Sequence, residues 1–429
     1  MIFDEAKSFL KKLIKIDSVE KEAVGDKPFG EGVAECLDVA LAEMERNGFK
    51  VKNGDYFYGY GEVGEGDLFG VLSHLDVVPI GSGWTHDPFG AEEADNKVFG
   101  RGALDDKGPY AAALYAAIKL LREGNVPKKR LRFIVGCDEE SGWRCMDHYK
   151  ECEELPKIGI SPDSDFPVIN CEKGIVYHTI KCPLPQGVVS VEGGDRANMV
   201  PNYAKAVLNN SLHNESVLLE NGVDFKVEDD LFIVETAGKN AHGSHPEQGD
   251  NALIKLLDIL SPLDANIKAI HDAFCDYTGK NIGLDMSDDV SGSLTLNLGC
   301  AKTVDNEIVF ELDIRHPVKT DKDKVTEIIK EALPVEVEQG YFHNPLYVPK
   351  DSPLVKTLLE SYEEVTGEKA EPIAIGGGTY ARCLPLGVAF GPCFPNGNSG
   401  MHCPDEYMDL DDFKKMINIY YVALKKLCF

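Results

Sequence analysis

The sequence has little positive charge, and it lacks the features of a nucleic-acid-binding protein. Its 44 Lys and Arg residues stand against 72 Asp and Glu residues, which leaves a formal net charge of −28. No basic patch of useful size interrupts this acidic excess, so the electrostatic footprint of a nucleic-acid partner is missing. We therefore expect no nucleic-acid partner. Because the acidic residues are spread along the chain, their simplest interpretation is solubility.

Long apolar runs and a cysteine framework are also missing. No stretch approaches the roughly 20 apolar residues that a membrane-spanning helix needs. Residues 1–16 mix apolar with charged residues, a pattern typical of an amphipathic helix and not of a signal peptide. The 12 cysteines are scattered and form no CxxC pair. These absences predict reduced thiols, a cytoplasmic location and no membrane partner.

A glycine-rich stretch at residues 375–382 lacks the Gly-Lys-Ser/Thr sequence of a phosphate-binding loop, and the chain has no dinucleotide-binding fingerprint. A nucleotide-binding α/β protein is one possible class, but only the glycine content favours it. The better interpretation is a backbone that approaches a ligand closely, because glycine has no Cβ.

The feature that the chain does contain is a set of apolar strands that end in metal-ligand residues. Residues 131–135 predict a buried strand of a parallel sheet, which ends near Glu139 and Glu140. Adjacent carboxylates at the end of a core strand repel each other, and a cation is the simplest reason for them. One carboxylate can ligate a metal while the other takes a proton from a metal-activated water. An isolated motif of this kind would more simply be a solvated acidic turn.

Three further segments of the same kind argue against a solvated turn. His74 and Asp76 lie at the end of an apolar run, and on a strand they would share one face. Asp105 and Asp106 lie in a glycine-rich turn before a helical run, where they could also be N-caps. Asp163 follows another short apolar strand. Because ligands gather at the carboxyl ends of parallel strands, these segments together predict a metal site.

The order of predicted elements indicates two domains of an α/β protein. Strands and helices alternate through residue 170, which predicts a mainly parallel sheet with helices on both faces. The pattern changes at about residue 175 to that of an inserted α+β domain. We expect a first domain made of residues 1–174 and 348–429, with the inserted domain at residues 175–347.

These motifs stand in an order that resembles the M20 metallopeptidase family, and within it the chain is most similar to PepV-type bacterial dipeptidases. The resemblance implies a zinc-peptidase-like catalytic domain and an inserted lid domain. The matching segments are residues 73–79, 100–108, 138–142, 162–167, 376–382 and 401–406.

The resemblance implies two Zn²⁺ ions per chain, for which Mn²⁺ or Co²⁺ could substitute. Asp105 would bridge the two ions, Glu139 would be the general base, and Asp76 would support His74. A cis peptide bond is expected between Asp105 and Asp106. The five implied metal ligands are His74, Asp105, Glu140, Asp163 and His402.

The resemblance also implies residues that bind the substrate. His242, in the lid motif, would stabilise the oxyanion of the tetrahedral intermediate. Arg315 would hold the substrate carboxylate with its fork of donors, although by sequence it could equally be a structural ion-pair residue. Asn198 would contact the substrate. Gly243 stands where relatives often have another small residue. The remaining substrate-binding candidates are Gly377, Gly378 and Thr379.

The predicted function is a metalloprotease of the dipeptidase type, in which a bridging water activated by two zinc ions and Glu139 hydrolyses short peptides with a free amino terminus. A small peptide is therefore the expected partner. The long insert favours a monomer, because dimeric members of the family borrow the lid histidine from a partner. The alternatives are an N-acyl-amino-acid deacylase or desuccinylase of the same family, and a non-catalytic metal-binding scaffold. The presence of Glu139 argues against the scaffold.

Overall fold

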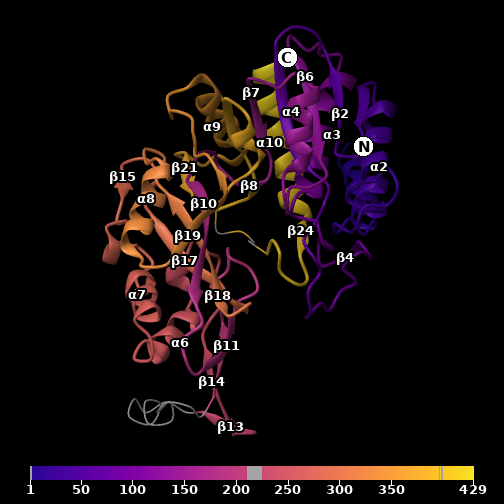
Figure 1. Cartoon of the computed structure of the whole chain (residues 1–429). Coiled ribbons are helices and arrows are strands. Elements are labelled where there is room, and N and C mark those ends of the chain that lie inside the picture. Colours follow the sequence, from indigo (N-terminus) through magenta and orange to yellow (C-terminus); the bar gives the residue numbers. More distant parts are fainter. Residues whose placement is uncertain (1, 210–224, 396, 398–399) are drawn as a thin grey trace. The chain divides into compact units, whose positions relative to one another are not determined.

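The chain forms two compact units in the computed structural model, which describes residues 2–209, 225–395, 397 and 400–429 (Figure 1). Unit 1 comprises Met1–Asn170, Leu346–Ile373 and Gly378–Phe429, and unit 2 comprises Cys171–Pro345 and Ala374–Gly377. The chain thus passes between the units inside its glycine-rich stretch. The catalytic and lid roles of the two predicted domains stay predictions.

The helices of unit 1 come from the N-terminal and the C-terminal parts of the chain. They are α1 (Ile2–Ile14), α2 (Glu31–Arg46), α3 (Lys107–Arg122), α4 (Arg144–Cys152), η3 (Tyr380–Cys383), α9 (Pro353–Thr366) and α10 (Leu410–Cys428). Its strands are β1 (Lys50–Gly54), β2 (Tyr58–Val63), β3 (Leu68–His74), β4 (Glu92–Ala94), β5 (Lys97–Phe99), β6 (Arg130–Gly136), β7 (Ile158–Ser161), β8 (Ser164–Asp165), β20 (Leu346–Tyr347), β22 (Leu386–Ala389), β23 (Pro392–Cys393) and β24 (Tyr407–Asp409). Two more strands, β9 (Ile169–Glu172) and β21 (Ile373–Ile375), lie where the chain passes between units.

The main sheet of unit 1 confirms the predicted α/β class. Its strands follow the order β1-β2-β6-β3-β7-β22 and continue through β9 and β20. The central strands β6, β3, β7 and β22 are parallel, whereas β1, β2 and β9 pair antiparallel with their neighbours. The parallel part therefore lies at the centre of a mixed sheet.

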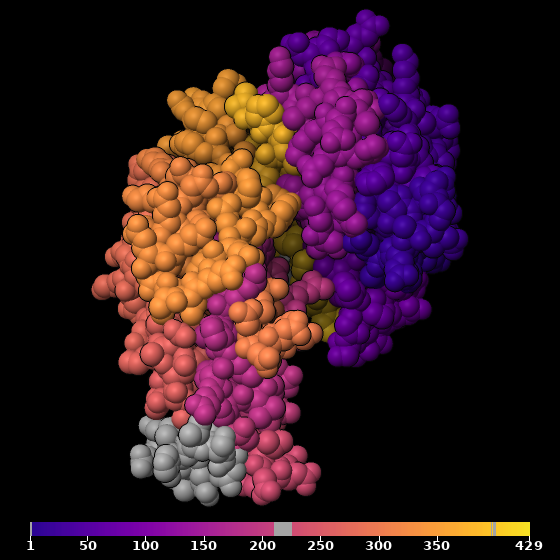
Figure 2. Space-filling view, viewed as in Figure 1, coloured from indigo at the N-terminus to yellow at the C-terminus, as the bar shows by residue number. Residues whose placement is uncertain are grey.

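Apolar residues cover both faces of this sheet, as the side-chain alternation of a buried strand requires. On β3, Val71 packs into the core with α1, α3 and α10, whereas Leu72 packs on the other face with α4. On β6, Phe133 and Ile134 divide between the same two cores. Full burial of each such side chain contributes about 1.5–3 kcal/mol. In the space-filling view, the indigo segment with α1 and α2 and the purple segment that follows it form a continuous surface (Figure 2).

The last two α-helices of unit 1, α9 and α10, begin at side-chain N-caps. The Ser352 hydroxyl accepts the backbone N–H of Val355 at the start of α9, Pro353 opens the first turn, and Gly367 ends the helix with φ 75°. Asp409 caps α10 in the same way. Within the described residues, no helix combines the length and the apolar character needed to cross a membrane.

Unit 2 is built on one antiparallel sheet, of order β13-β14-β12-β11-β17-β18-β10-β19. Apolar residues on alternate positions of this sheet form a single core with α6, α7 and α8, as expected for an α+β domain. The strands are β10 (Gly174–Pro183), β11 (Val188–Gly193), β12 (Tyr203–Asn209), β13 (Lys226–Glu228), β14 (Leu231–Ala237), β15 (Ser287–Asp288), β16 (Gly292–Ser293), β17 (Thr295–Val304), β18 (Glu307–His316) and β19 (Glu336–His343). The helices are α6 (Ala252–Leu260), α7 (Ala265–Phe274), α8 (Lys322–Ala332), η1 (Pro246–Gln248) and η2 (Lys280–Ile282).

A buried histidine lies between the sheet of unit 2 and α8. The His178 Nε2 atom is 2.9 Å from the Thr326 hydroxyl, and its Nδ1 atom has no hydrogen-bond partner among the described residues. Burial, with a smaller effect from the nearby charge of Lys330, lowers the pKa of His178 from 6.5 to about 4. The folded chain therefore keeps this imidazole neutral where an exposed one would take a proton.

We predict that His178 makes unit 2 sensitive to acid. Its pKa is lower in the folded than in the unfolded chain, so stability falls as the pH drops from about 6.5 towards about 4, by up to about 3 kcal/mol. In urea unfolding followed by circular dichroism, the change from pH 7 to pH 4.5 should cost the wild type more than it costs His178→Gln. The exposed His245, replaced by Gln, is the control. Equal losses in wild type and His178→Gln would contradict the prediction.

Candidate metal centre

Three of the five candidate ligands lie at the carboxyl ends of three adjacent parallel strands in unit 1. β3 ends at His74, Glu139 and Glu140 follow the end of β6, and Asp163 follows the end of β7. Asp105 lies in the turn before α3. Because the strands and α3 are buried, the backbone is held firmly while these polar side chains meet at one edge of the sheet.

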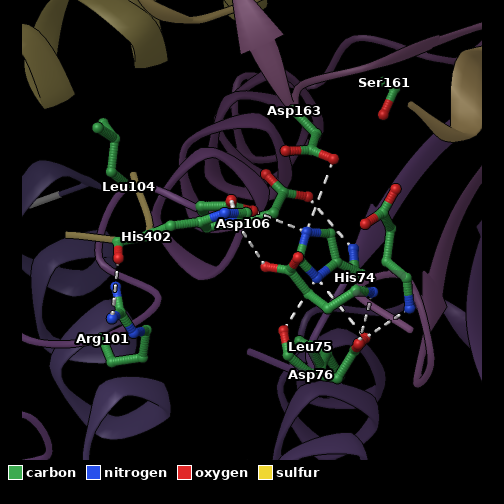
Figure 3. A network of polar contacts seen from close by, with 12 residues as sticks. His74, Leu75, Asp76, Arg101, Leu104, Asp106, Ser161, Asp163 and His402 are labelled. Atoms are coloured by element: carbon green, nitrogen blue, oxygen red, sulfur yellow. Dashed lines mark hydrogen bonds and ion pairs between the residues drawn. The ribbon is translucent and has the colours of Figure 1, made fainter. Parts of the chain in front are cut away.

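The structure brings all five predicted ligands together. The His74 Nε2 atom is 2.9 Å from Asp105 Oδ1 and 3.6 Å from Asp163 Oδ2. The His402 Nε2 atom is 2.9 Å from Asp105 Oδ2 and 3.0 Å from Glu140 Oε1. Asp105 therefore turns one carboxylate oxygen to each histidine, and Figure 3 shows the rings of His74 and His402 with Asp163 next to His74. This is the arrangement that a bridging carboxylate requires.

Two groups of donors are compact enough to hold a cation. Their ligand atoms lie within 4.8 Å of one another, one group joining His74 with Glu139 and Asp163, the other joining His74 with Asp105 and Glu140. Imidazole and carboxylate donors suit Zn²⁺, and also Mn²⁺ or Co²⁺. Glu139 belongs to the first group, so distance alone does not separate a role as base from a role as ligand.

The carboxylates of this cluster repel one another. Burial, together with the charge of Asp163, raises the pKa of Glu139 well above its usual range. Burial and the charge of Asp105 raise the pKa of Asp163 to about 7. Burial also acts to raise the pKa of Asp105, but hydrogen bonds from His402 and His74 outweigh it and lower that pKa. A positive charge bound among these carboxylates would reduce their repulsion and so stabilise the site.

The histidines respond in the opposite direction. Burial acts to lower the pKa of His74, but its hydrogen bonds to Asp105 and Asp163 outweigh burial and raise the pKa well above 6.5. For His402, the charge of Glu140 and the hydrogen bonds to Asp105 and Glu140 outweigh burial and raise the pKa to about 11. Carboxylates that draw a proton onto each imidazole also draw a metal ion, and metal binding would release those protons.

Asp106 adds a polar atom that this cluster leaves unpaired. Its Oδ2 atom accepts the backbone N–H of His74 at 3.2 Å, whereas Oδ1 is buried and has no hydrogen-bond partner within the described part of the chain. The peptide bond between Asp105 and Asp106 is cis, which confirms the prediction. The donor set and this unpaired carboxylate oxygen fit the two metal ions that the family resemblance implies.

Asp76 supports the site in two ways, of which the sequence predicted one. The prediction that His74 and Asp76 share a strand face is wrong, because β3 ends at His74. Instead, His74 Nδ1 lies 2.9 Å from the backbone oxygen of Asp76 (Figure 3). A carbonyl only accepts, so Nδ1 carries the proton and Nε2 faces Asp105 as a ligand atom would. The Asp76 carboxylate accepts the backbone N–H groups of Glu139 and Glu140, at 3.1 and 3.0 Å.

Asp138, which the sequence did not single out, holds the turn that carries the two glutamates. Its carboxylate accepts the backbone N–H groups of Gly142 and Arg144, at 3.0 and 2.9 Å, and pairs with the Arg144 guanidinium at 2.7 Å. Asp138 is part of the sequence motif around Glu139, but the spacing of that motif did not indicate that its carboxylate would hydrogen-bond to the backbone of the turn.

In unit 2, His242 is oriented by its own loop. Its Nδ1 atom accepts the backbone N–H of Ser244 at 3.2 Å and is 2.6 Å from the Ser244 hydroxyl. A backbone N–H only donates, so in the neutral ring the proton lies on Nε2. Such an Nε2–H group can donate to an oxyanion, which is the chemistry expected of this residue.

Arg315 already has a carboxylate partner within unit 2. Its Nε and Nη2 atoms donate to the two carboxylate oxygens of Asp313, at 2.8 Å each, and both residues are buried. Its Nη1 atom donates to the backbone oxygen of Gly376 at 3.1 Å. The alternative of an ion-pair residue is thus what the structure shows, and binding of a substrate carboxylate at the other edge of the guanidinium stays a prediction.

Asn198 lies next to the His242 loop in unit 2. Its backbone oxygen accepts the N–H of Gly243 at 2.7 Å. The Asn297 side-chain amide donates to the backbone oxygens of the two residues that flank Asn198, Ala197 at 2.9 Å and Met199 at 2.8 Å. The backbone that carries Asn198 is therefore held in place beside His242, and contact of its side chain with a substrate stays a prediction.

The three candidates of the glycine-rich stretch divide between the units. Gly377 belongs to unit 2, whereas Gly378 and Thr379 belong to unit 1. The Thr379 hydroxyl accepts the backbone N–H of Ala381 and caps η3. The boundary between the units therefore separates residues that the sequence grouped as one loop.

Comparison with known proteins identifies the family. The model of the peptidase family M20/M25/M40 matches residues 70–426, which include every candidate ligand. The chain belongs to this family. Its members are peptidases, so the chain is classed among the hydrolases. The resemblance to the M20 metallopeptidases is thereby confirmed, and the PepV-type subgroup stays a prediction.

Relatives in the M20 family match along almost the whole chain. "Putative dipeptidase YtjP" of Bacillus subtilis is 40% identical, and the match covers 97% of this chain and 96% of the relative. "Putative dipeptidase SSP1012" of Staphylococcus saprophyticus is 37% identical, with 98% and 96% covered.

Solved structures of the family share the fold. The M20 metallo-carboxypeptidase Sso-CP2 of Sulfolobus solfataricus has a TM-score of 0.61 and 20% identity, over 98% of this chain and 99% of that one. The dipeptidase Dug1p of Saccharomyces cerevisiae has a TM-score of 0.62 and 15% identity, over 99% and 97%. At these identities the likeness shows the fold alone.

Gly243 allows the His242 loop to pack closely against the ion pair of Arg315 and Asp313 in unit 2. A Cβ atom at this position would lie 2.8 Å from Asp313 Oδ2 and 3.0 Å from the backbone carbonyl of Asn198. Asp313 is held by its two bonds to Arg315, so it cannot easily move away. Glycine is therefore the residue that this packing accepts.

We predict that Gly243→Ala destabilises unit 2 by about 1–3 kcal/mol, because the added methyl group forces a packed ion pair and a backbone segment apart. Urea unfolding of the whole chain measures the change. Gly340→Ala is the matched control, since its Cβ would meet no atom of the described residues closer than 3.4 Å. If both variants unfold at the same urea concentration as the wild type, the close approach at Gly243 carries no cost and the explanation is wrong.

Proposed function

We propose that this M20 family member is a dinuclear zinc dipeptidase that hydrolyses short peptides with a free amino terminus. The observation that carries the proposal is the position of Asp105, whose two carboxylate oxygens each lie 2.9 Å from the Nε2 atom of a different histidine. The names of the relatives support the substrate class, because those at 40% and 37% identity are called dipeptidases.

The proposed ligands divide into two sets around Asp105. His74 and Asp163 lie on one side of it, and His402 and Glu140 lie on the other. Two zinc ions bound there would supply Lewis acidity for a peptide carbonyl and lower the pKa of a water molecule. Asp76 keeps His74 in the tautomer that such binding needs.

Glu139 is the proposed general base. It takes a proton from water as the water oxygen attacks the scissile carbonyl carbon, and it returns that proton to the leaving nitrogen when the C–N bond breaks. Its backbone is fixed by Asp76, and its carboxylate lies close to His74 and Asp163, where a water held by the proposed metal ions would be within reach.

The residues of unit 2 would bind the peptide and its oxyanion. His242 would donate from Nε2 to the developing oxyanion, as its contacts with Ser244 favour. Arg315 would offer the substrate carboxylate the edge of its guanidinium that Asp313 does not occupy. Asn198 and the backbone of Gly377, Gly378 and Thr379 would complete the contacts.

We predict metal-dependent cleavage of free dipeptides. The assay uses Ala-Ala, Leu-Gly, β-Ala-His, N-acetyl-methionine and N-succinyl-diaminopimelate, with metal-stripped protein and with added zinc or manganese. The dipeptides should be cleaved only with metal, and Glu139→Gln should lower kcat by about 10²–10⁴-fold because it cannot accept a proton.

The other outcomes separate the alternatives. Cleavage of only the acylated compounds would show a deacylase or desuccinylase. Binding of two zinc ions without cleavage of any compound would show a metal-binding scaffold. Zinc titration of Glu139→Gln is the control, because the variant must still bind metal for its loss of activity to report on proton transfer.

A further inference from the structure

A buried ion pair in unit 1 contacts the backbone of two proposed metal ligands. The Arg101 Nη1 atom donates to Glu406 Oε2 at 2.6 Å, and each residue is 1% exposed. The pair forms because β5 and β24 pair antiparallel, with Arg101 just after β5 and Glu406 just before β24. The backbone N–H of Gly100 also donates to the backbone oxygen of Glu406, at 2.8 Å. Two segments far apart in the sequence are thus joined at this point.

Each partner of this pair also holds a segment that carries a proposed ligand. The second carboxylate oxygen of Glu406 accepts the backbone N–H of Leu104 at 2.8 Å and that of Asp105 at 3.3 Å. The Arg101 guanidinium donates to the backbone oxygens of Cys403 at 3.2 Å and His402 at 3.5 Å. Figure 3 shows Arg101 beside His402. The pair therefore links the backbones of Asp105 and His402.

The backbone at His402 needs such support. Its φ angle is 62°, in the left-handed region that residues other than glycine rarely adopt. Its side chain is half-exposed, so packing alone does not hold the imidazole in place. The carbonyl contacts from Arg101 act on the same residues that carry this conformation. A ligand on a loop keeps its position only when its supporting bonds are fixed.

Stability alone does not account for this arrangement. Burying two charges costs several kcal/mol, and well-packed apolar residues in place of a buried ion pair are often as stable or more stable. The pair here makes further hydrogen bonds to both ligand segments, and Arg101 Nη2 also lies 3.4 Å from the backbone oxygens of Pro79 and Ile80. Its charges also cancel, so its effect on the metal centre is one of geometry and not of net charge.

We propose that Arg101 and Glu406 are positioning residues that set the distance between Asp105 and His402 and thereby the affinity for the metal ion that these two ligands share. This inference rests on the proposed two-metal function. Arg101 acts through the His402 segment, and Glu406 acts through the Asp105 segment. Loss of either partner should therefore weaken one metal ion more than the other, since His74 keeps its own support from the backbone oxygen of Asp76.

Zinc titration of the metal-stripped full chain, by calorimetry with a competing chelator, tests the proposal. Arg101→Met should weaken one of two zinc equivalents by about 10–100-fold, the range for loss of a residue that orients a metal ligand. Arg101→Lys keeps the charge but replaces the planar fork of donors with a single ammonium nitrogen, which cannot occupy the positions of both Nη1 and Nη2. It should give a smaller loss, and it provides a second variant if Arg101→Met does not fold.

Arg132→Met is the matched control. Arg132 is also buried and paired with a glutamate, Glu62, at 2.6 Å, but this pair joins β6 to β2. We expect the control to unfold at a lower temperature than the wild type and to keep both zinc affinities. Arg101→Met with unchanged affinities and a lowered unfolding temperature, as in the control, would show a structural pair only and overturn the proposal.

The titration also separates this proposal from the proposed function. Wild-type protein that binds two zinc ions but cleaves no dipeptide would overturn the function, and the affinity of the variants would still decide the role of the pair. Wild-type protein that binds fewer than two zinc ions would overturn both. In an active enzyme, the kcat of Arg101→Met should recover towards the wild-type value as zinc is raised, because the lost ion returns by mass action.

Discussion

Repulsion among buried carboxylates is the constraint on which the rest of unit 1 depends. Asp105, Asp163 and Glu139 meet at one edge of a sheet, and burial together with their mutual repulsion raises the pKa of Glu139 and Asp163. A fold keeps such a cluster only if the backbone beneath it is strong and the charge is compensated. The buried parallel strands supply the first condition, and the contacts of His74 and His402 with Asp105 supply part of the second, which the proposed cations would complete.

Unit 2 also buries a charge that needs compensation, but here it is a single one. Arg315 is buried, and Asp313 compensates its charge through two hydrogen bonds of 2.8 Å. The compensation leaves one edge of the guanidinium for another contact, with the backbone oxygen of Gly376 already beside it. The missing side chain of Gly243 makes room for the pair next to the His242 loop. The packing of unit 2 therefore fixes the orientation of the Arg315 guanidinium and of the His242 loop.

The sequence predicted the parts of the site that rest on local pattern. Apolar strands that end in Glu139 and Glu140 or in His74 are visible as short runs, because buried parallel strands are continuously apolar. His402 has no such signal, since it lies in a loop before the last helix, and the family resemblance was needed to make it a ligand. Local pattern also could not predict the pair of Arg101 and Glu406, whose members are 305 residues apart in the chain. Contacts of that kind depend on which strands become neighbours, and that is decided by the whole fold.

This distribution links metal binding to folding. The ligands come from the ends of β3, β6 and β7, from the turn before α3, and from the loop before β24, so no short piece of the chain holds the site. The donors come together only when the central sheet and the pair of β5 with β24 have formed. A cation that binds these donors therefore stabilises the folded unit and not the unfolded chain. Because the carboxylates repel one another without it, a metal ion bound at these donors would also remove much of the electrostatic cost of forming the site.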